Sequence, residues 1–114
     1  MGNELELMRG TLDLLVLQTL AGEPLHGYAV ATAIKERSGG ELLVEEGALY
    51  PALHRLETKG LVEAEWGVSE NNRKARYYAL TRAGQRALKA SVSQWERYVR
   101  AVDRVIAPAG SKGR

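Results

Sequence analysis

The stretch GALYPALHRLETKG at residues 47–60 decides the fold, because it combines a helical period with a helix stop. On an ideal helix of about 3.6 residues per turn, Leu49, Leu53 and Leu56 lie on one face. The final glycine can end such a helix in the left-handed conformation. The pattern therefore predicts a helix over residues 47–59 that buries its leucine face and leaves its other face polar.

The polar face of this helix has the residue types that a DNA-recognition helix needs. Small residues near its start allow a close approach to base edges, and the donors behind them can reach bases or phosphates. These residues are Gly47, Pro51, His54, Arg55 and Thr58, with Ala48 and Tyr50 at the margins. An ordinary amphipathic surface helix would show the same pattern. We expect the proline in the first turn or at a local irregularity.

Two shorter helices are predicted before this stretch. Residues 12–20 are nearly all apolar, Thr11 can act as the N-cap, and Asp13 falls in the first turn, where the helix dipole favours an acid. We expect a helix from residue 5 or 11 to residue 21. A second helix is expected over residues 28–37, because a Ser-Gly-Gly sequence follows it.

A β-hairpin is predicted after the recognition-helix candidate. Val62, Ala64 and Trp66 alternate with two glutamates, residues 67–72 have turn chemistry, and residues 75–80 contain good strand formers. Cations at a hairpin tip are suited to phosphate contacts, although a solvated turn without a partner is the alternative. The candidates are Arg73, Lys74 and Arg76.

A long helix is predicted over residues 82–106, with Thr81 as its N-cap. Its apolar residues are spaced alternately by four and three, a heptad stripe that indicates a second helix packed along it. The stripe consists of Leu88, Val92, Trp95, Val99, Val102 and Ile106. We expect it to form a homodimer interface, with packing inside the monomer as the alternative. Trp95 is expected in the dimer core, or else as a stacking plate for a flat ligand.

Composition excludes several classes of function. The chain has 114 residues, no cysteine and two histidines, neither of them in a metal-binding motif. No nucleophile–base pair, glycine-rich phosphate loop or paired-carboxylate motif is present, so we expect neither an enzyme nor a cofactor. No apolar run is long enough to span a bilayer, and the start lacks the basic flank of a signal peptide, so we expect a cytoplasmic protein.

The charges are divided unevenly along the chain. Residues 1–57 carry 4 basic and 9 acidic residues, whereas residues 58–114 carry 12 basic and 5 acidic ones. A basic half favours a polyanionic partner such as DNA. Glu45 and Glu46 run against this trend beside the recognition-helix candidate. They either face away from DNA or accept a hydrogen bond from a cytosine amino group.

The order helix, helix, helix, hairpin, long helix predicts a mainly α fold with a small β-hairpin, arranged as a winged helix-turn-helix plus a long C-terminal dimerisation helix. We expect residues 1–80 to form the DNA-binding domain, residues 81–107 the dimerisation helix and residues 108–114 a flexible tail. The rival fold is a plain helical bundle that carries a hairpin. The rival function is a winged-helix protein-interaction module that does not bind DNA.

Three motifs resemble the PadR family of bacterial transcriptional regulators: LHGY at residues 25–28, GALYPALHRLE at residues 47–57 and YYALTRAG at residues 77–84. The resemblance extends over residues 7–106 and is to the compact members with a single C-terminal helix. It implies a homodimeric winged-helix repressor of a palindromic operator. The third helix would enter the major groove, and the wing would reach a flanking minor groove or the DNA backbone.

The resemblance also implies roles for single residues. Tyr50 matches the tyrosine of the family motif, which implies a position close to DNA, and Tyr28 is expected to contact a phosphate. Serine or threonine is more usual in the family at the positions of Glu45 and Ala48. These departures indicate a different operator preference.

A ligand site is implied by the same resemblance. Some compact members stack flat aromatic drugs on a tryptophan between the last helices of the dimer, and Trp95 matches that position. Val99, Leu12 and Asp13 would line the same cavity. An aromatic effector bound there would change the spacing of the two recognition helices and release the operator.

Overall fold

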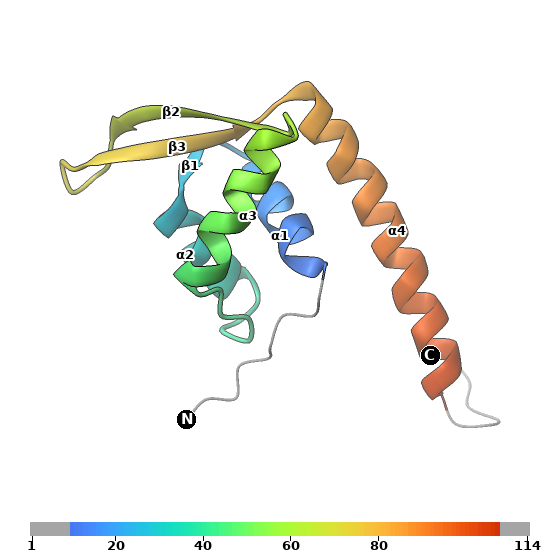
Figure 1. Cartoon of the computed structure of the whole chain (residues 1–114). Coiled ribbons are helices and arrows are strands. Elements are labelled where there is room, and N and C mark those ends of the chain that lie inside the picture. The colour runs from blue at the N-terminus through green and yellow to red at the C-terminus, as the bar shows by residue number, and fades with distance from the viewer. Residues whose placement is uncertain (1–9, 108–114) are drawn as a thin grey trace.

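Four helices and a three-stranded antiparallel sheet make up the computed structural model, which describes residues 10–107. The helices are α1 (Thr11–Leu20), α2 (Gly27–Arg37), α3 (Glu46–Thr58) and α4 (Arg82–Ile106), and the strands are β1 (Leu25–His26), β2 (Val62–Val68) and β3 (Lys74–Leu80). In Figure 1, α1, α2 and α3 gather beside the base of the sheet, the β2–β3 hairpin projects beyond them, and α4 leads away on the other side. The predicted winged helix-turn-helix with a long last helix is confirmed.

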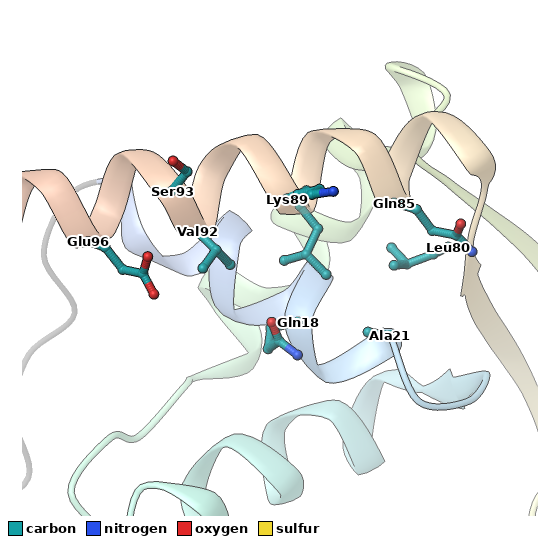
Figure 2. Close-up of a pocket in the computed structure, with 9 residues that line it drawn as sticks. Gln18, Ala21, Leu80, Gln85, Lys89, Val92, Ser93 and Glu96 are labelled. Carbon is teal, nitrogen blue, oxygen red and sulfur yellow. The ribbon is translucent and has the colours of Figure 1, made fainter.

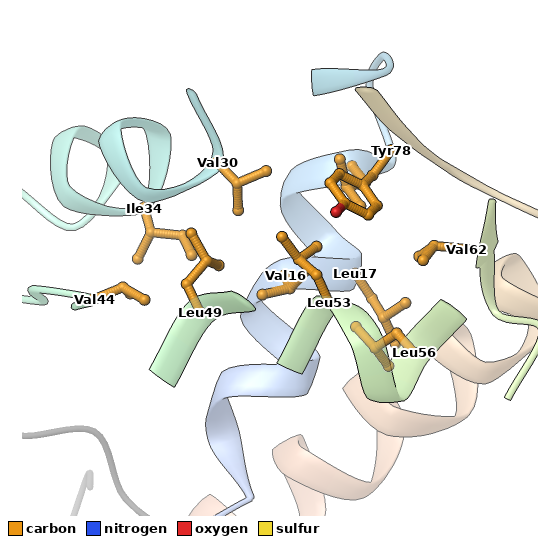
Figure 3. Close-up of a cluster of buried hydrophobic side chains, with 11 residues drawn as sticks. Val16, Leu17, Val30, Ile34, Val44, Leu49, Leu53, Leu56, Val62 and Tyr78 are labelled. Atoms are coloured by element: carbon orange, nitrogen blue, oxygen red, sulfur yellow. The ribbon is translucent and has the colours of Figure 1, made fainter. Parts of the chain in front are cut away.

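The hydrophobic core lies where α1, α2, α3 and the base of the sheet meet. Leu49, Leu53 and Leu56 of α3 are buried, which confirms the predicted leucine face, and Ala52 is buried beside them. Figure 3 shows the other side chains that converge on these leucines, namely Val16, Leu17, Val30, Ile34, Val44, Val62 and Tyr78. The core therefore fixes which face of α3 remains available to a partner.

Strand β1 was not predicted. It has two residues and pairs with the middle strand of the sheet, Leu25 opposite Tyr78 and His26 opposite Tyr77. Two residues are too few to show a strand period, and the pairing partner lies more than fifty positions away in the chain. The pairing joins the start of α2 to the wing, which consists of β2, β3 and the turn between them at residues 69–73.

The helix starts differ from the prediction in two places. Gly10 occupies the N-cap of α1 in the left-handed conformation, so Thr11 is the first helical residue rather than the cap. Helix α2 begins one residue earlier than expected. Its N-cap is His26, whose Nδ1 atom accepts a hydrogen bond from the backbone N–H of Ala29 at 3.2 Å. The alternative start of the first helix at residue 5 falls outside the described residues.

Pro51 lies in the second turn of α3, and not in the first turn as predicted. The helix starts at Glu46, where the N–H groups of Ala48 and Leu49 already donate to the carbonyl of Glu45, and it runs without a break to Thr58. Proline has no N–H to donate to the carbonyl four positions earlier. The carbonyl in question is that of Gly47. Both Gly47 and Pro51 are exposed, so this carbonyl lies on the solvent side of α3.

The start of α4 is fixed by hydrogen bonds to the turn between α3 and β2. The Thr81 hydroxyl accepts from the N–H of Gly84 at 3.0 Å, which confirms the predicted N-cap, and donates to the carbonyl of Gly60 at 2.7 Å. Its backbone N–H donates to the carbonyl of Leu61. The predicted tail at residues 108–114 lies outside the described residues. Within residues 10–107, no helix is both long and apolar enough to cross a membrane.

We predict that Gly84→Ala destabilises the protein. A Cβ atom at this buried position would overlap the carbonyl oxygen of Leu61, which is backbone and can move only if the turn moves with it. We expect the free energy of unfolding to fall by about 1–3 kcal/mol, measured by urea unfolding with circular dichroism. The control is Gly47→Ala, because a Cβ atom there meets open space. That variant should gain up to about 1 kcal/mol, and equal stability of the two variants would contradict this account.

Candidate nucleic-acid interface

Helix α3 presents most of its predicted DNA-contacting residues to solvent. Gly47, Ala48, Pro51, His54 and Arg55 are all exposed. The buried leucines on the opposite face leave this side of the helix free of protein contacts except at its margins. The exposed side has small residues near the start of the helix and polar residues after them, a shape and chemistry that fit a DNA major groove.

Tyr50 lies at a margin of this face and folds back over the start of α2. A Cβ atom added at Gly27 would lie 2.6–2.8 Å from atoms of the Tyr50 ring, so the glycine makes room for the ring. Burial raises the pKa of the Tyr50 phenol, and the carboxylate of Glu46 and the nearby Tyr78 act in the same direction. The hydroxyl therefore keeps its proton and can donate a hydrogen bond to a phosphate.

Arg55 is held by α1. Its Nη2 atom donates to the Oδ1 atom of Asp13 at 2.8 Å, across 42 positions of the chain. Both side chains are partly exposed, so the pair contributes at most about 1 kcal/mol. The pair orients the guanidinium toward the start of α1, and a phosphate contact by Arg55 would require that pair to loosen.

The wing divides its three predicted cations into two groups. Arg73 and Lys74 are exposed, and neither forms an ion pair with any residue in the described range 10–107. Arg76 instead donates from both terminal nitrogens to the carboxylate of Glu57 on α3, at 2.9 and 3.4 Å. Arg76 therefore connects the wing to α3, whereas Arg73 and Lys74 are exposed cations without a carboxylate partner in residues 10–107.

His26 connects the start of α2 to the wing tip. Its Nε2 atom lies 3.5 Å from the Oε1 atom of Glu70, and its ring meets the Tyr77 ring edge-on at 5.4 Å. Hydrogen bonds from the backbone N–H of Glu70 and from the His26 imidazole hold the pKa of the Glu70 carboxyl below its ordinary value. Because Nδ1 accepts from Ala29, the neutral imidazole carries its proton on Nε2.

A concave surface of about 930 Å³ lies between the wing and α2. Five of the predicted DNA-contacting residues line it, and these are Tyr28, Tyr50, Arg73, Lys74 and Arg76. Tyr28 is 72% exposed and stacks on His26 with the ring centroids 6.5 Å apart. The remaining predicted residues lie on the exposed side of α3 and do not line this surface.

Trp66 also lines this surface and was missed as a candidate. The strand alternation places it on the same face as Val62, but the wing extends beyond the core, and Trp66 is 62% exposed while Val62 is buried. The alternation gives the face of the strand correctly. It cannot indicate where the underlying core ends.

Two grooves flank the contact between α4 and α1. Figure 2 shows the first, of about 490 Å³, in which Gln18 of α1 and Ala21, which follows α1, lie across from Val92 of α4. The second, of about 370 Å³, is lined by residues that include Asp13, Trp95 and Tyr98.

The structure thus brings together two of the four residues predicted to bind a ligand, Asp13 and Trp95. The other two lie elsewhere. Leu12 packs against the hydrophobic core, and Val99 does not line the groove. An aromatic neighbour that was not predicted, Tyr98, has its ring centroid 6.0 Å from that of Trp95.

The apolar stripe of α4 becomes more exposed toward the end of the helix. Leu88 packs against the core, and Val92 and Val99 are half-buried. Farther along, Val102 and Ile106 are 36% and 63% exposed. In Figure 1 this end of α4 lies away from the other elements that the structure describes.

The comparison with protein families decides the identity. The model of the PadR-like family of transcriptional regulators matches residues 16–90, which include α2, α3, the wing and the first part of α4. The chain belongs to the PadR-like family. It is therefore a DNA-binding transcription regulator and not an enzyme.

Relatives and solved structures agree with this assignment. The transcriptional regulator Rv3488 of Mycobacterium tuberculosis is 39% identical over 83 residues, which are 73% of this chain and 74% of that protein. A transcriptional regulator from Clostridium thermocellum superposes with a TM-score of 0.79 at 26% identity, covering 86% of this chain and 95% of its own. A PadR family regulator from Eggerthella lenta superposes with a TM-score of 0.74 at 33% identity, covering 87% and 84%.

We predict that Gly27→Ala weakens DNA binding by this PadR-like protein more than it weakens the fold. The new methyl group would meet the far end of the Tyr50 side chain, which can swing aside, so the fold tolerates the change. The Tyr50 ring would then move away from the start of α2. We expect a three- to tenfold loss of affinity, which corresponds to about 0.7–1.4 kcal/mol, in a mobility-shift titration. A variant that unfolds early in urea, or that binds DNA normally, would contradict the role given to Tyr50.

Proposed function

We propose that this regulator is a homodimeric repressor that occupies a palindromic operator in a promoter. One observation carries the proposal. Cations and tyrosines from α2, α3 and the wing gather on one concave surface, while Val102 and Ile106 at the far end of the α4 stripe are 36% and 63% exposed. The first feature suits DNA, and the second suits another copy of the chain.

The DNA contacts would come from two elements in each protomer. The exposed side of α3, with Gly47, Ala48, Pro51 and His54, would lie in the major groove, and Arg73 and Lys74 on the wing would contact phosphates of the flanking backbone. Tyr28 and Tyr50 would donate hydroxyl hydrogen bonds to phosphates beside α2. With Arg55 and Arg76 engaged in ion pairs, few cations per protomer are available, so tight binding would need both protomers.

The dimer would form along α4. A leucine–valine–tryptophan stripe with alternate spacings of four and three packs well against a copy of itself in a two-fold arrangement. In this proposal, residues 1–80 act as the DNA-binding domain and residues 81–107 as the dimerisation helix. Two-fold symmetry would place one recognition helix on each half-site, about one helical turn apart. Because promoter DNA is the partner, we place the protein in the cytoplasm.

An effector would bind in the groove lined by Trp95, Tyr98 and Asp13. Two exposed aromatic rings offer stacking faces, and the carboxylate favours a ligand that carries positive charge. The groove lies against α4, which the dimer proposal makes the interface. A planar aromatic cation bound there would change the separation of the two recognition helices and release the operator.

We predict that Val102→Lys dissociates the dimer and abolishes DNA binding. The change places a charge on the stripe, where the partner's α4 would have to bury it. Light scattering at micromolar concentration should change from a dimer mass to a monomer mass. A mobility-shift titration with a duplex taken from upstream of the protein's own gene should lose its salt-sensitive shift.

The control for this experiment is Val105→Lys. Val105 is 83% exposed and lies outside the stripe, so this variant adds the same charge to the same helix and should remain dimeric and bind DNA. A monomeric unaltered protein, or equal behaviour of the two variants, would refute the dimer. A protein that shifts no DNA would refute the repressor.

We predict that planar aromatic cations quench the fluorescence of Trp95. The measurement uses a Trp66→Phe variant, in which Trp95 is the single tryptophan, titrated with cationic and neutral aromatic dyes of similar size. Asp13→Asn should lower the affinity for the cationic dye about tenfold, which corresponds to about 1.4 kcal/mol, and leave the neutral dye unaffected. Unchanged emission at saturating dye would rule out this groove as the effector site.

A further inference from the structure

The concave surface between the wing and α2 holds an exposed tryptophan that the proposed contacts do not yet use. Trp66 lies on β2, and 62% of its surface is exposed. The Nζ atom of Lys74, on the neighbouring strand, lies 5.1 Å from the centroid of the Trp66 ring. The guanidinium carbon of Arg76 lies 6.0 Å from the same ring. The indole is therefore in contact with cations on the strand beside it, and the rest of its surface is open to solvent.

The two walls of this surface differ in charge. The wing side carries the cations Arg73, Lys74 and Arg76 with one carboxylate, Glu70. The α2 side carries the carboxylates of Glu23 and Glu36 with one cation, Arg37. A polyanion would therefore approach along the wing side. Tyr28 and Tyr50, which line the same surface, give it polar hydroxyls near the start of α2.

Lys74 is held in place by the indole. A cation over an indole face is attracted by the negative face of the ring, and this attraction reduces the number of conformations that a long lysine side chain samples. An ammonium that is already placed loses less entropy when it meets a phosphate. The open part of the indole, beside that ammonium, offers an apolar plane of the size of a deoxyribose.

We propose that Trp66 is a DNA-contacting residue, which packs its indole against a deoxyribose of the backbone while Lys74 pairs with the adjacent phosphate. This inference rests on the proposed DNA binding and assigns it a non-ionic contact on the wing. Sugar and phosphate recur at every nucleotide, so the pair contacts the backbone without reading the base sequence. The apolar contact of Trp66 adds affinity that salt does not screen, in a protein with few available cations.

The test compares affinity and its salt dependence. A fluorescently labelled duplex from upstream of the protein's own gene is titrated at several salt concentrations with the unaltered protein, Trp66→Ala and Lys74→Ala. Trp66→Ala should bind about tenfold more weakly at every salt concentration, with an unchanged slope of log affinity against log salt. Lys74→Ala should lower the magnitude of that slope by about 0.9 for each phosphate that the variant no longer neutralises.

Two further variants sharpen the comparison. Val68→Ala is the matched control, because Val68 lies on the same strand, is 66% exposed and does not line the concave surface, so its affinity should not change. Trp66→Phe retains an aromatic plane and should recover part of the affinity that Trp66→Ala removes. The fall in tryptophan emission as the duplex is added should be larger in the unaltered protein than in Trp66→Phe, and the difference reports on Trp66.

Each other outcome overturns the inference. If Trp66→Ala binds as tightly as the unaltered protein, DNA binding stands and the Trp66 contact fails. If Trp66→Ala lowers the slope as much as Lys74→Ala does, the indole only positions the lysine and does not touch the sugar. If a planar dye quenches Trp66 and the duplex does not, the occupant is a small molecule. If the unaltered protein binds no duplex, both this inference and the repressor proposal fail.

Discussion

Burial of the leucine face of α3 is the constraint on which the rest of the structure depends. Three leucines, each contributing about 1.5–3 kcal/mol when removed from water, pack against α1, α2 and the base of the sheet. Once this face is buried, the opposite face must point outward, and the small and polar residues on it become the surface that the protein presents. The wing follows from the same packing. Strand β2 begins with the buried Val62 and then continues past the edge of the core. The turn and β3, which pairs with it, therefore hold Arg73 and Lys74 away from the body of the protein.

Much of this architecture could be predicted from local patterns. The helical period of the leucines, the alternation around residue 64 and the threonine N-cap of α4 each act within a few positions, so the sequence displays them directly. The features that were missed depend on partners far away in the chain. Strand β1 forms because its two residues pair with β3. The Tyr50 ring packs over the start of α2 because Gly27 has no side chain there. Trp66 is exposed because the hydrophobic core ends before it along β2. The alternation of residues in a strand does not indicate where the core ends.

The basic residues show how structure changes the meaning of a charge count. The sequence places four cations near the proposed DNA surface, but their environments differ. Arg55 and Arg76 are paired with carboxylates and connect α3 to α1 and to the wing, whereas Arg73 and Lys74 have no carboxylate partner within residues 10–107. The first two connect α3 to its neighbours, and the last two supply positive potential at the surface. A prediction based on charge alone gives all four the same role, because pairing is a property of the fold.

The ion pair between Asp13 and Arg55 has a consequence for regulation. Asp13 lines the groove beside Trp95, and Arg55 lies on α3, the proposed recognition helix, so one pair connects the two proposed binding sites. A cationic ligand that takes the carboxylate would free the guanidinium for phosphate, and DNA that takes the guanidinium would free the carboxylate for the ligand. Coupling between two binding sites is reciprocal, and here its sign is positive. This pair alone would make the ligand and DNA bind cooperatively. The proposed release of an operator would therefore require a change in the distance between the two α3 helices that is large enough to outweigh this coupling.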